Sequence, residues 1–402
     1  MNTPPGPLPV AHPNHFGSAI GVAQEWLAHP RSIFGVTVWP GWQIPDALAL
    51  PVGFLAAAGL VLALISLVAM VMIYLERKVA GHIQSRLGPM RVGWHGILQS
   101  VADGLKLLVK EDIIPDNANR FLFSLAPALV MVGAFVPFAA LPFADGLVFA
   151  NMDIGLFYIL GFASLEVIGV IMAGWASGSK WSLFGGMRLA AQMMSYEIPL
   201  GLSVLTVAIM AGSLNLSEIT RAQATLPFVL QSPFAFMGFF VFYIAALANT
   251  KRAPFDLPEA ESELVSGFHT EYSGMRFAFF FLAEYAAMAL VSAVGSILFL
   301  GGWNFPFSGE GRPLVGLLQL GLKTFALLFM MLWLRWTLPR VRIDQVMYLC
   351  LKVLLPMGMF CLLGAGFQAV AGMALPLWGA VLALAAVTYL IGRRSPSSAP
   401  AA

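Results

Sequence analysis

The sequence predicts an all-α protein that crosses a membrane several times. Hydrophobic residues make up 59% of its 402 residues and charged residues only 10%, against about 25% in soluble globular proteins. The apolar residues also gather in stretches of about 20 residues or more, the length that a helix needs to cross the hydrocarbon core. Such a chain cannot cover a soluble fold with ionised groups. Its net charge of +2 does not indicate a nucleic-acid partner.

Long intervals between charged residues mark eight membrane-spanning helices. The first has its core at residues 51–75, and the second covers 121–144. The six that follow lie at 154–179, 189–217, 222–250, 277–309, 313–334 and 346–371. Single charged residues interrupt four of the first seven intervals: Glu166, Glu197, Glu284 and Lys323.

The C-terminal part of the chain predicts one further crossing. Residues 353–392 are 40 uncharged residues in a row, which as a helix would extend about 60 Å, roughly twice the hydrocarbon thickness. We therefore expect a ninth span near 374–391. The chain then divides into an N-terminal extension (1–46), a membrane domain (47–371) with long connections at 76–120 and 249–276, and a C-terminal segment (372–402).

The basic residues predict the orientation. Sixteen of the 22 Lys and Arg residues fall in the odd-numbered connections, whereas the opposite side holds Arg31, Arg221 and Arg312. Lys and Arg are enriched in cytoplasmic connections. We therefore expect the odd-numbered connections in the cytoplasm and the N-terminal extension in the periplasm.

The first connection contains an amphipathic helix near residues 97–110. Its apolar residues recur at near-helical spacing: Ile97, Leu98, Val101, Leu105 and Leu108. This pattern is typical of a helix lying along the membrane surface, and the alternative is a helix that braces the bundle. Earlier in this connection, Glu76, Arg77 and Lys78 lie where the first span leaves the bilayer, and the alternative to a functional role is that they are interface anchors.

The fifth connection, 249–276, contains an acidic cluster. Its carboxylates are Asp256, Glu259, Glu261 and Glu263. Pro258 is suited to the first turn of a helix, in which Glu259 and Glu263 would share a face. The next basic residue is Arg276, so the cluster lacks local neutralisation, and close carboxylates raise one another's pKa values. This arrangement favours proton uptake and release, although acidic residues at a helix start also suit the helix dipole.

The three carboxylates inside spans point to a proton or ion pathway. Glu166, Glu197 and Glu284 are costly in hydrocarbon, and such groups usually serve transport. Beside Glu197, Pro199 removes a backbone donor and loosens the helix. The alternative is a structural contact between helices, for example of Glu284 with Lys323. These observations leave open a proton-coupled transporter and a subunit of a redox-driven pump.

Five segments, in order, resemble the H subunit of bacterial NADH-quinone oxidoreductase, the respiratory complex I homologue of mitochondrial NADH dehydrogenase subunit 1. They are residues 76–89 with 102–107, 173–177, 191–197, 254–272 with 283–285, and 338–345. The resemblance implies eight membrane helices and a chamber that admits the quinone headgroup. The implied quinone path is lined by Arg77, Arg86, Asp103 and Lys106. The implied proton-coupling residues are Asp256, Glu259, Glu261 and Glu263 in the acidic connection, followed by Glu197 and Glu284.

The resemblance also implies the cofactors, partners and location. The substrate would be a quinone, ubiquinone, whereas FMN and iron–sulfur clusters would belong to partner subunits. These partners would be the peripheral-arm subunits of the quinone site and the small and antiporter-like membrane subunits, with membrane lipid around them in the bacterial inner membrane. From the residues themselves we expect no metal, because Cys350 and Cys361 form no CxxC pair.

This chain departs from the family pattern at two charged positions. Many relatives have Glu where it has Asn249, and it carries Glu166 at a position that is often apolar in relatives. Glu166 would replace the missing carboxylate if both positions face one cavity. The alternatives are the homologous membrane subunit of an energy-converting hydrogenase or formate hydrogenlyase, and a stand-alone proton-coupled transporter.

Overall fold

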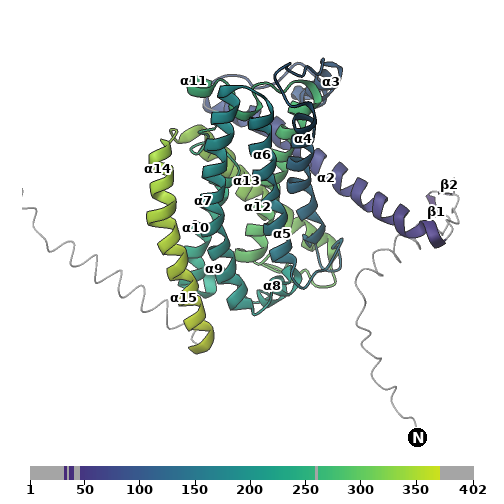
Figure 1. Ribbon diagram of the computed structural model, residues 1–402. Coiled ribbons are helices and arrows are strands. Elements are labelled where there is room, and N and C mark those ends of the chain that lie inside the picture. Colours follow the sequence, from purple (N-terminus) through teal and green to yellow (C-terminus); the bar gives the residue numbers. More distant parts are fainter. Residues whose placement is uncertain (1–30, 34–35, 40–45, 259–260, 372–402) are drawn as a thin grey trace, which may run out of the picture.

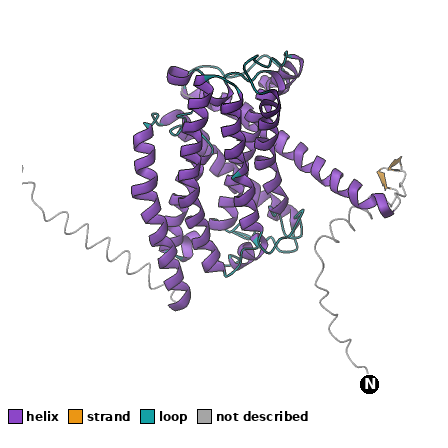
Figure 2. Cartoon of the chain, in the orientation of Figure 1, coloured by secondary structure: helices purple, strands orange, loops and turns teal. Residues whose placement is uncertain are grey.

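A computed structural model describes residues 31–33, 36–39, 46–258 and 261–371. Within these residues the chain is a bundle of apolar helices (Figure 1 and Figure 2). Seven of them are long and apolar enough to cross a membrane, and an eighth, α10, is shorter and equally apolar. This confirms the predicted polytopic helix bundle. The predicted ninth span lies outside the described residues.

The spans follow the predicted intervals. They are α2 (Asp46–Ile83), α4 (Arg120–Phe135) with the 3-10 turn η2 (Val136–Ala140), α5 (Gly155–Ala163) with α6 (Leu165–Ala176), α7 (Lys180–Ala211), α10 (Pro233–Asn249), α12 (Gly274–Phe299), α13 (Pro313–Thr337), and α14 (Ile343–Tyr348) with the π-helical η4 (Leu349–Leu354) and α15 (Leu355–Ala371). The connections hold η1 (Trp94–Gly96), α3 (Gln99–Val109), α8 (Leu216–Ala222), α9 (Phe228–Gln231), α11 (Glu261–Leu264) and η3 (Gly267–His269). A hairpin of β1 (Arg31–Ile33) and β2 (Val36–Trp39) precedes α2.

The odd-numbered and even-numbered connections lie at opposite ends of the bundle. Figure 1 shows α3 and α11 at one end and α8 and α9 at the other. The end with α3 and α11 is therefore the one that carries most of the basic residues.

The first span, α2, leans away from the bundle and contacts it with its C-terminal half (Figure 1). Ile65, Ala69, Met72 and Glu76 are buried in that half, and their spacing of three or four residues forms one stripe on the helix. Glu76 therefore continues an apolar contact stripe into the bundle, which argues against the alternative that it is an interface anchor.

The turn η1 and the surface helix α3 each form a hydrogen bond with α2. Ser100 Oγ donates to the carbonyl of Met70 at 3.0 Å, and Tyr74 donates to the carbonyl of His95 at 3.0 Å. Leu105 and Leu108 are exposed on the other side. The helix thus both braces the bundle and presents an apolar face.

Small residues bring α4 and α6 close together. A Cβ atom on Gly133 would lie 2.8 Å from the backbone nitrogen of Glu166, and one on Gly169 would lie 2.5 Å from Val130 Cγ2. Ser164 interrupts the third span between α5 and α6. As a result Glu166 falls in the first turn of α6, turned into the bundle.

Candidate functional site

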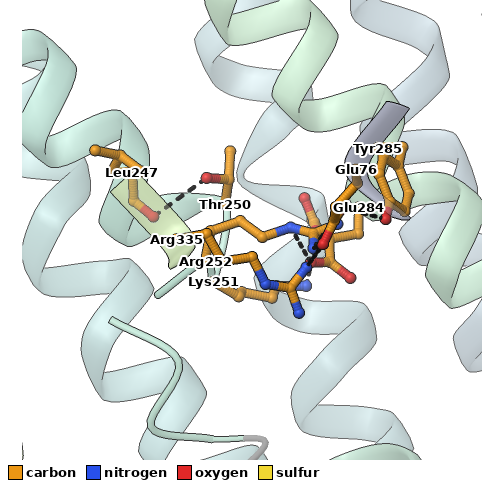
Figure 3. A network of polar contacts seen from close by, with 9 residues as sticks. Glu76, Leu247, Thr250, Lys251, Arg252, Glu284, Tyr285 and Arg335 are labelled. Carbon is orange, nitrogen blue, oxygen red and sulfur yellow. Dashed lines mark hydrogen bonds and ion pairs between the residues drawn. The ribbon is translucent and has the colours of Figure 1, made fainter. Parts of the chain in front are cut away.

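Two carboxylates, two guanidinium groups and a tyrosine meet inside the bundle (Figure 3). We call Glu76, Arg252, Glu284, Tyr285 and Arg335 the Glu76 cluster. Arg252 Nη1 lies 3.2 Å from Glu76 Oε1, and Arg252 Nε lies 2.7 Å from Glu284 Oε1. Tyr285 donates to Glu76 Oε2 at 2.5 Å, and Arg335 forms an ion pair with Glu76. Segments far apart in the sequence therefore converge on one ionic group.

Burial makes the pairing in this cluster essential. Arg252 is 2% exposed, Glu76 5% and Glu284 8%, and unpaired buried charges are strongly unfavourable. Burial alone lowers the pKa of Arg252, but Glu284, Tyr285 and Glu76 outweigh this effect and raise it. Arg252 thus keeps its positive charge.

The residue before Arg252 forms a second buried ion pair. Lys251 Nζ lies 2.6 Å from Glu166 Oε1, and both side chains are buried. We call these two residues the Lys251 pair. Lys251 has a left-handed φ of 59°, which is unfavourable for a residue with a side chain. The chain turns there, and the two consecutive cations engage different carboxylates.

The motif at 191–197 holds this turn in place. Gln192 Nε2 donates to the carbonyl of Ala248 at 2.7 Å and to that of Phe255 at 3.0 Å, so α7 binds both sides of the turn. Further along, a Cβ atom on Gly185 would lie 2.6 Å from Gly267 Cα. This glycine lets the fifth connection pack directly on the backbone of α7.

Glu197 is the third of the carboxylates predicted to lie inside a span. It is half-buried and forms no hydrogen bond or ion pair within the described part of the chain. The charge of Glu166 acts on it from the neighbouring helix. Tyr196 donates to the carbonyl of Val346 at 2.9 Å, and the Cys350 thiol donates to the carbonyl of Ser195 at 2.9 Å. These contacts fix the helix turn that carries Glu197.

Two carboxylates of the acidic connection are paired with remote arginines, which its local sequence did not indicate. Arg340 Nη2 lies 3.3 Å from Asp256 Oδ2, and Arg188 Nη1 lies 2.6 Å from Glu263 Oε2. Of the helix expected from Pro258, the structure describes α11 (Glu261–Leu264). Glu259 lies outside the described residues.

Three of the four residues of the predicted quinone path come together. Arg77 forms an ion pair with Asp103, and Lys106 Nζ lies 3.9 Å from Asp103 Oδ1. Gln99, which donates to Asp103 at 3.3 Å, lines an open hollow of about 400 Å³ together with residues 87–91. Arg86 lies apart from this group and contacts Gln84.

The suggested contact between Glu284 and Lys323 does not form. Lys323 Nζ donates to the carbonyls of Leu300 and Gly302, both at 2.7 Å, and so satisfies the C-terminal end of α12. Glu284 has Arg252 as its partner instead. Arg252 and Arg335 were not predicted as site residues from the sequence, because both were counted only as markers of orientation.

The spans and the buried ion pairs define the class of this protein. It is a polytopic membrane protein in which ionisable groups extend from one end of the bundle into the spans. Soluble enzymes and single-span anchors lack this combination.

Comparison with known proteins identifies the family. The NADH dehydrogenase family matches residues 56–365. The NADH-quinone oxidoreductase H subunit of Chlorobium luteolum is 50% identical over 325 residues, covering 77% of this chain and 87% of the relative. The H subunit of Anaeromyxobacter dehalogenans is 44% identical over 359 residues, covering 83% and 86%. The H 2 subunit of Rhizobium meliloti is 49% identical over 309 residues, covering 75% and 92%. The chain belongs to the NADH dehydrogenase family, as a membrane subunit of NADH-quinone oxidoreductase.

Proposed function

We propose that this subunit binds the quinone headgroup beside α3 and couples its reduction to proton translocation through the buried carboxylates. The observation that carries the proposal is the series of ionisable groups formed by the Glu76 cluster, the Lys251 pair and Glu197. Intramembrane carboxylates of this kind are typical of proton routes. Ubiquinone would be the substrate, and FMN and the iron–sulfur clusters would belong to partner subunits.

The quinone end of the route lies at the first connection. Arg77, Asp103 and Lys106 provide donors and a carboxylate beside the hollow. A neighbouring α2 residue, Glu76, belongs to the buried cluster, so one helix connects the two regions. A change of charge at the quinone would act on the cluster electrostatically, because opposite and like charges nearby shift proton affinity.

Glu166 supplies the carboxylate that is missing at Asn249. It lies against Lys251, two residues after Asn249 in the chain, and its charge acts on Glu197. A position facing lipid would have argued against this replacement, but Glu166 is 5% exposed. We infer that the route passes through Glu166 to Glu197, which is left available for a proton partner in a neighbouring subunit.

The test uses the intact complex in proteoliposomes. Glu284→Gln and Glu197→Gln should each lower proton pumping relative to quinone reduction, since each removes a group that gains and loses a proton. Glu310→Gln, at an exposed position on the other end of the bundle, serves as the control. Full pumping by both assembled variants would refute the coupling function. Copurification of hydrogenase activity without NADH oxidation would favour the hydrogenase alternative.

A further inference from the structure

Within the Glu76 cluster and the Lys251 pair, the ion-paired groups are balanced in charge, and the half-buried Glu197 is not part of this count. The carboxylates of Glu76, Glu166 and Glu284 face three cations, Lys251, Arg252 and Arg335. Among the other groups nearby, Asp256 also acts on Glu284 but has Arg340 as a partner. A proton that enters this network therefore leaves a net positive charge in a buried site, which is strongly unfavourable unless another proton departs.

A nearby histidine does not change this balance. Burial, together with the positive charge of Lys251, lowers the pKa of His269 to about 4. The imidazole is therefore neutral near pH 7 and adds no charge to the network. The compensating proton must then come from one of the three cations or from a carboxylic acid that has just been formed.

Lys251 differs from the other two cations in its chemistry. A guanidinium group does not lose its proton in proteins, so Arg252 and Arg335 stay charged, whereas an ammonium group can become a neutral amine. Lys251 Nζ also lies within direct proton-transfer distance of Glu166, at 2.6 Å from Oε1. The next residue in the chain, Arg252, contacts Glu284 at 2.7 Å, so the backbone holds Lys251 beside the Glu76 cluster. Lys251 is thus placed between the two groups of carboxylates.

We propose that Lys251 is a proton-relay residue that passes protons from the Glu76 cluster to Glu166. In the first step an N–H bond of the ammonium breaks, its electron pair stays on Nζ, and an O–H bond forms on Glu166. In the second step the neutral amine takes up the proton held on the Glu284 side, which restores the ammonium. The cycle closes when Glu166 passes its proton on towards Glu197, so that one proton has moved and the buried charge is unchanged. This inference rests on the proposed coupling function.

The alternative is that Lys251 is only a structural partner of Glu166. Lys251→Arg separates the two roles, because Arg keeps the charge and the ion pair but does not release a proton. We expect the variant complex in proteoliposomes to assemble and to reduce quinone, with protons pumped per NADH lowered about tenfold or more, as for loss of a positioned proton donor. Lys352→Arg, at an exposed position on η4, makes the same replacement outside the network and should pump normally.

The outcomes distinguish the relay from the coupling function itself. Full pumping by Lys251→Arg, alongside impaired pumping by Glu284→Gln, would overturn the relay and keep the coupling function. Full pumping by Lys251→Arg, Glu284→Gln and Glu197→Gln would overturn both. If Lys251→Arg does not assemble, Lys251→Gln takes its place, because it keeps Glu166 and can still donate a hydrogen bond to it. Impaired pumping with normal quinone reduction by that complex supports the relay, and full pumping overturns it.

Discussion

Arg252 Nε lies 2.7 Å from Glu284 Oε1, and this contact joins the fifth connection to the interior of α12. The same guanidinium contacts Glu76 of α2 and stacks 4.5 Å from the ring centre of Tyr285. One side chain therefore holds the first span, the acidic connection and the sixth predicted span in a single arrangement. Events at α2 and at the connection have a direct path to α12.

Glu76→Gln should destabilise the protein. The carboxylate accepts from Arg252, Arg335 and Tyr285, so its loss leaves two guanidinium groups with Glu284 alone. Removing one partner of a buried pair costs about 3–5 kcal/mol. We expect less assembled complex and a lower melting temperature in detergent, with Glu310→Gln as the matched control. Unchanged assembly and melting would show that water or lipid neutralises the cluster.

Asp103→Asn should weaken quinone use without unfolding the protein. The Arg77–Asp103 pair is partly exposed, and such pairs contribute at most about 1 kcal/mol to stability. Loss of a charged hydrogen-bond group in a binding site costs roughly tenfold in affinity. We expect KM for quinone to rise by about that factor. Asp145→Asn, which breaks a partly exposed pair with Arg221 at the other end of the bundle, should leave this KM unchanged, and an equal effect would argue against the assignment of Asp103.

His269 should make stability depend on pH. Its pKa is about 4 in the folded protein and 6.5 in a model peptide, so the fold favours the neutral form. The stability that this preference contributes is complete above about pH 6.5 and is lost as the pH falls towards 4, by about 3 kcal/mol at most. His269→Gln should flatten the fall in melting temperature between about pH 7 and pH 5. His82→Gln, at an exposed position, should leave the fall as steep as in the natural chain.

Cysteine labelling should reveal the orientation. Cys350 and Cys361 are buried, so they should remain unlabelled in the folded protein. Phe307→Cys and Leu338→Cys place exposed thiols at opposite ends of α13. In right-side-out vesicles an impermeant maleimide should label Phe307→Cys alone, because the basic connections are expected in the cytoplasm. Labelling of Leu338→Cys alone would show that the chain has the opposite orientation. A reporter fused after Arg394 tests the ninth span in the same way.

The spans were predictable because charged residues are rare over the length of a membrane helix. Glu166, Glu197 and Glu284 stood out as the exceptions within such apolar stretches, so their positions inside spans were predictable too. Their partners did not, since Glu166 pairs with a residue 85 positions away and Glu76 with residues 176 and 259 positions away. Helices that are apolar on most sides give little sign of how they are rotated. For this reason the sequence did not show that Glu76 faces the interior of the bundle.

The acidic connection shows the same limit. Its sequence holds four carboxylates between positions 256 and 263, and no Lys or Arg follows them until Arg276, so the cluster was predicted to lack local neutralisation. Arg188 and Arg340 approach from α7 and from the segment between α13 and α14. Sequence spacing reveals charge balance along a single element, but not across elements that meet only in the folded protein.

Lys251 and Arg252 are consecutive residues, so a single peptide unit carries the cations of both the Lys251 pair and the Glu76 cluster. A displacement of this peptide that draws one cation away from its carboxylate must move the other as well. A small displacement of the fifth connection therefore changes two sets of contacts together: that of Lys251 with Glu166, and those of Arg252 with Glu76 and Glu284.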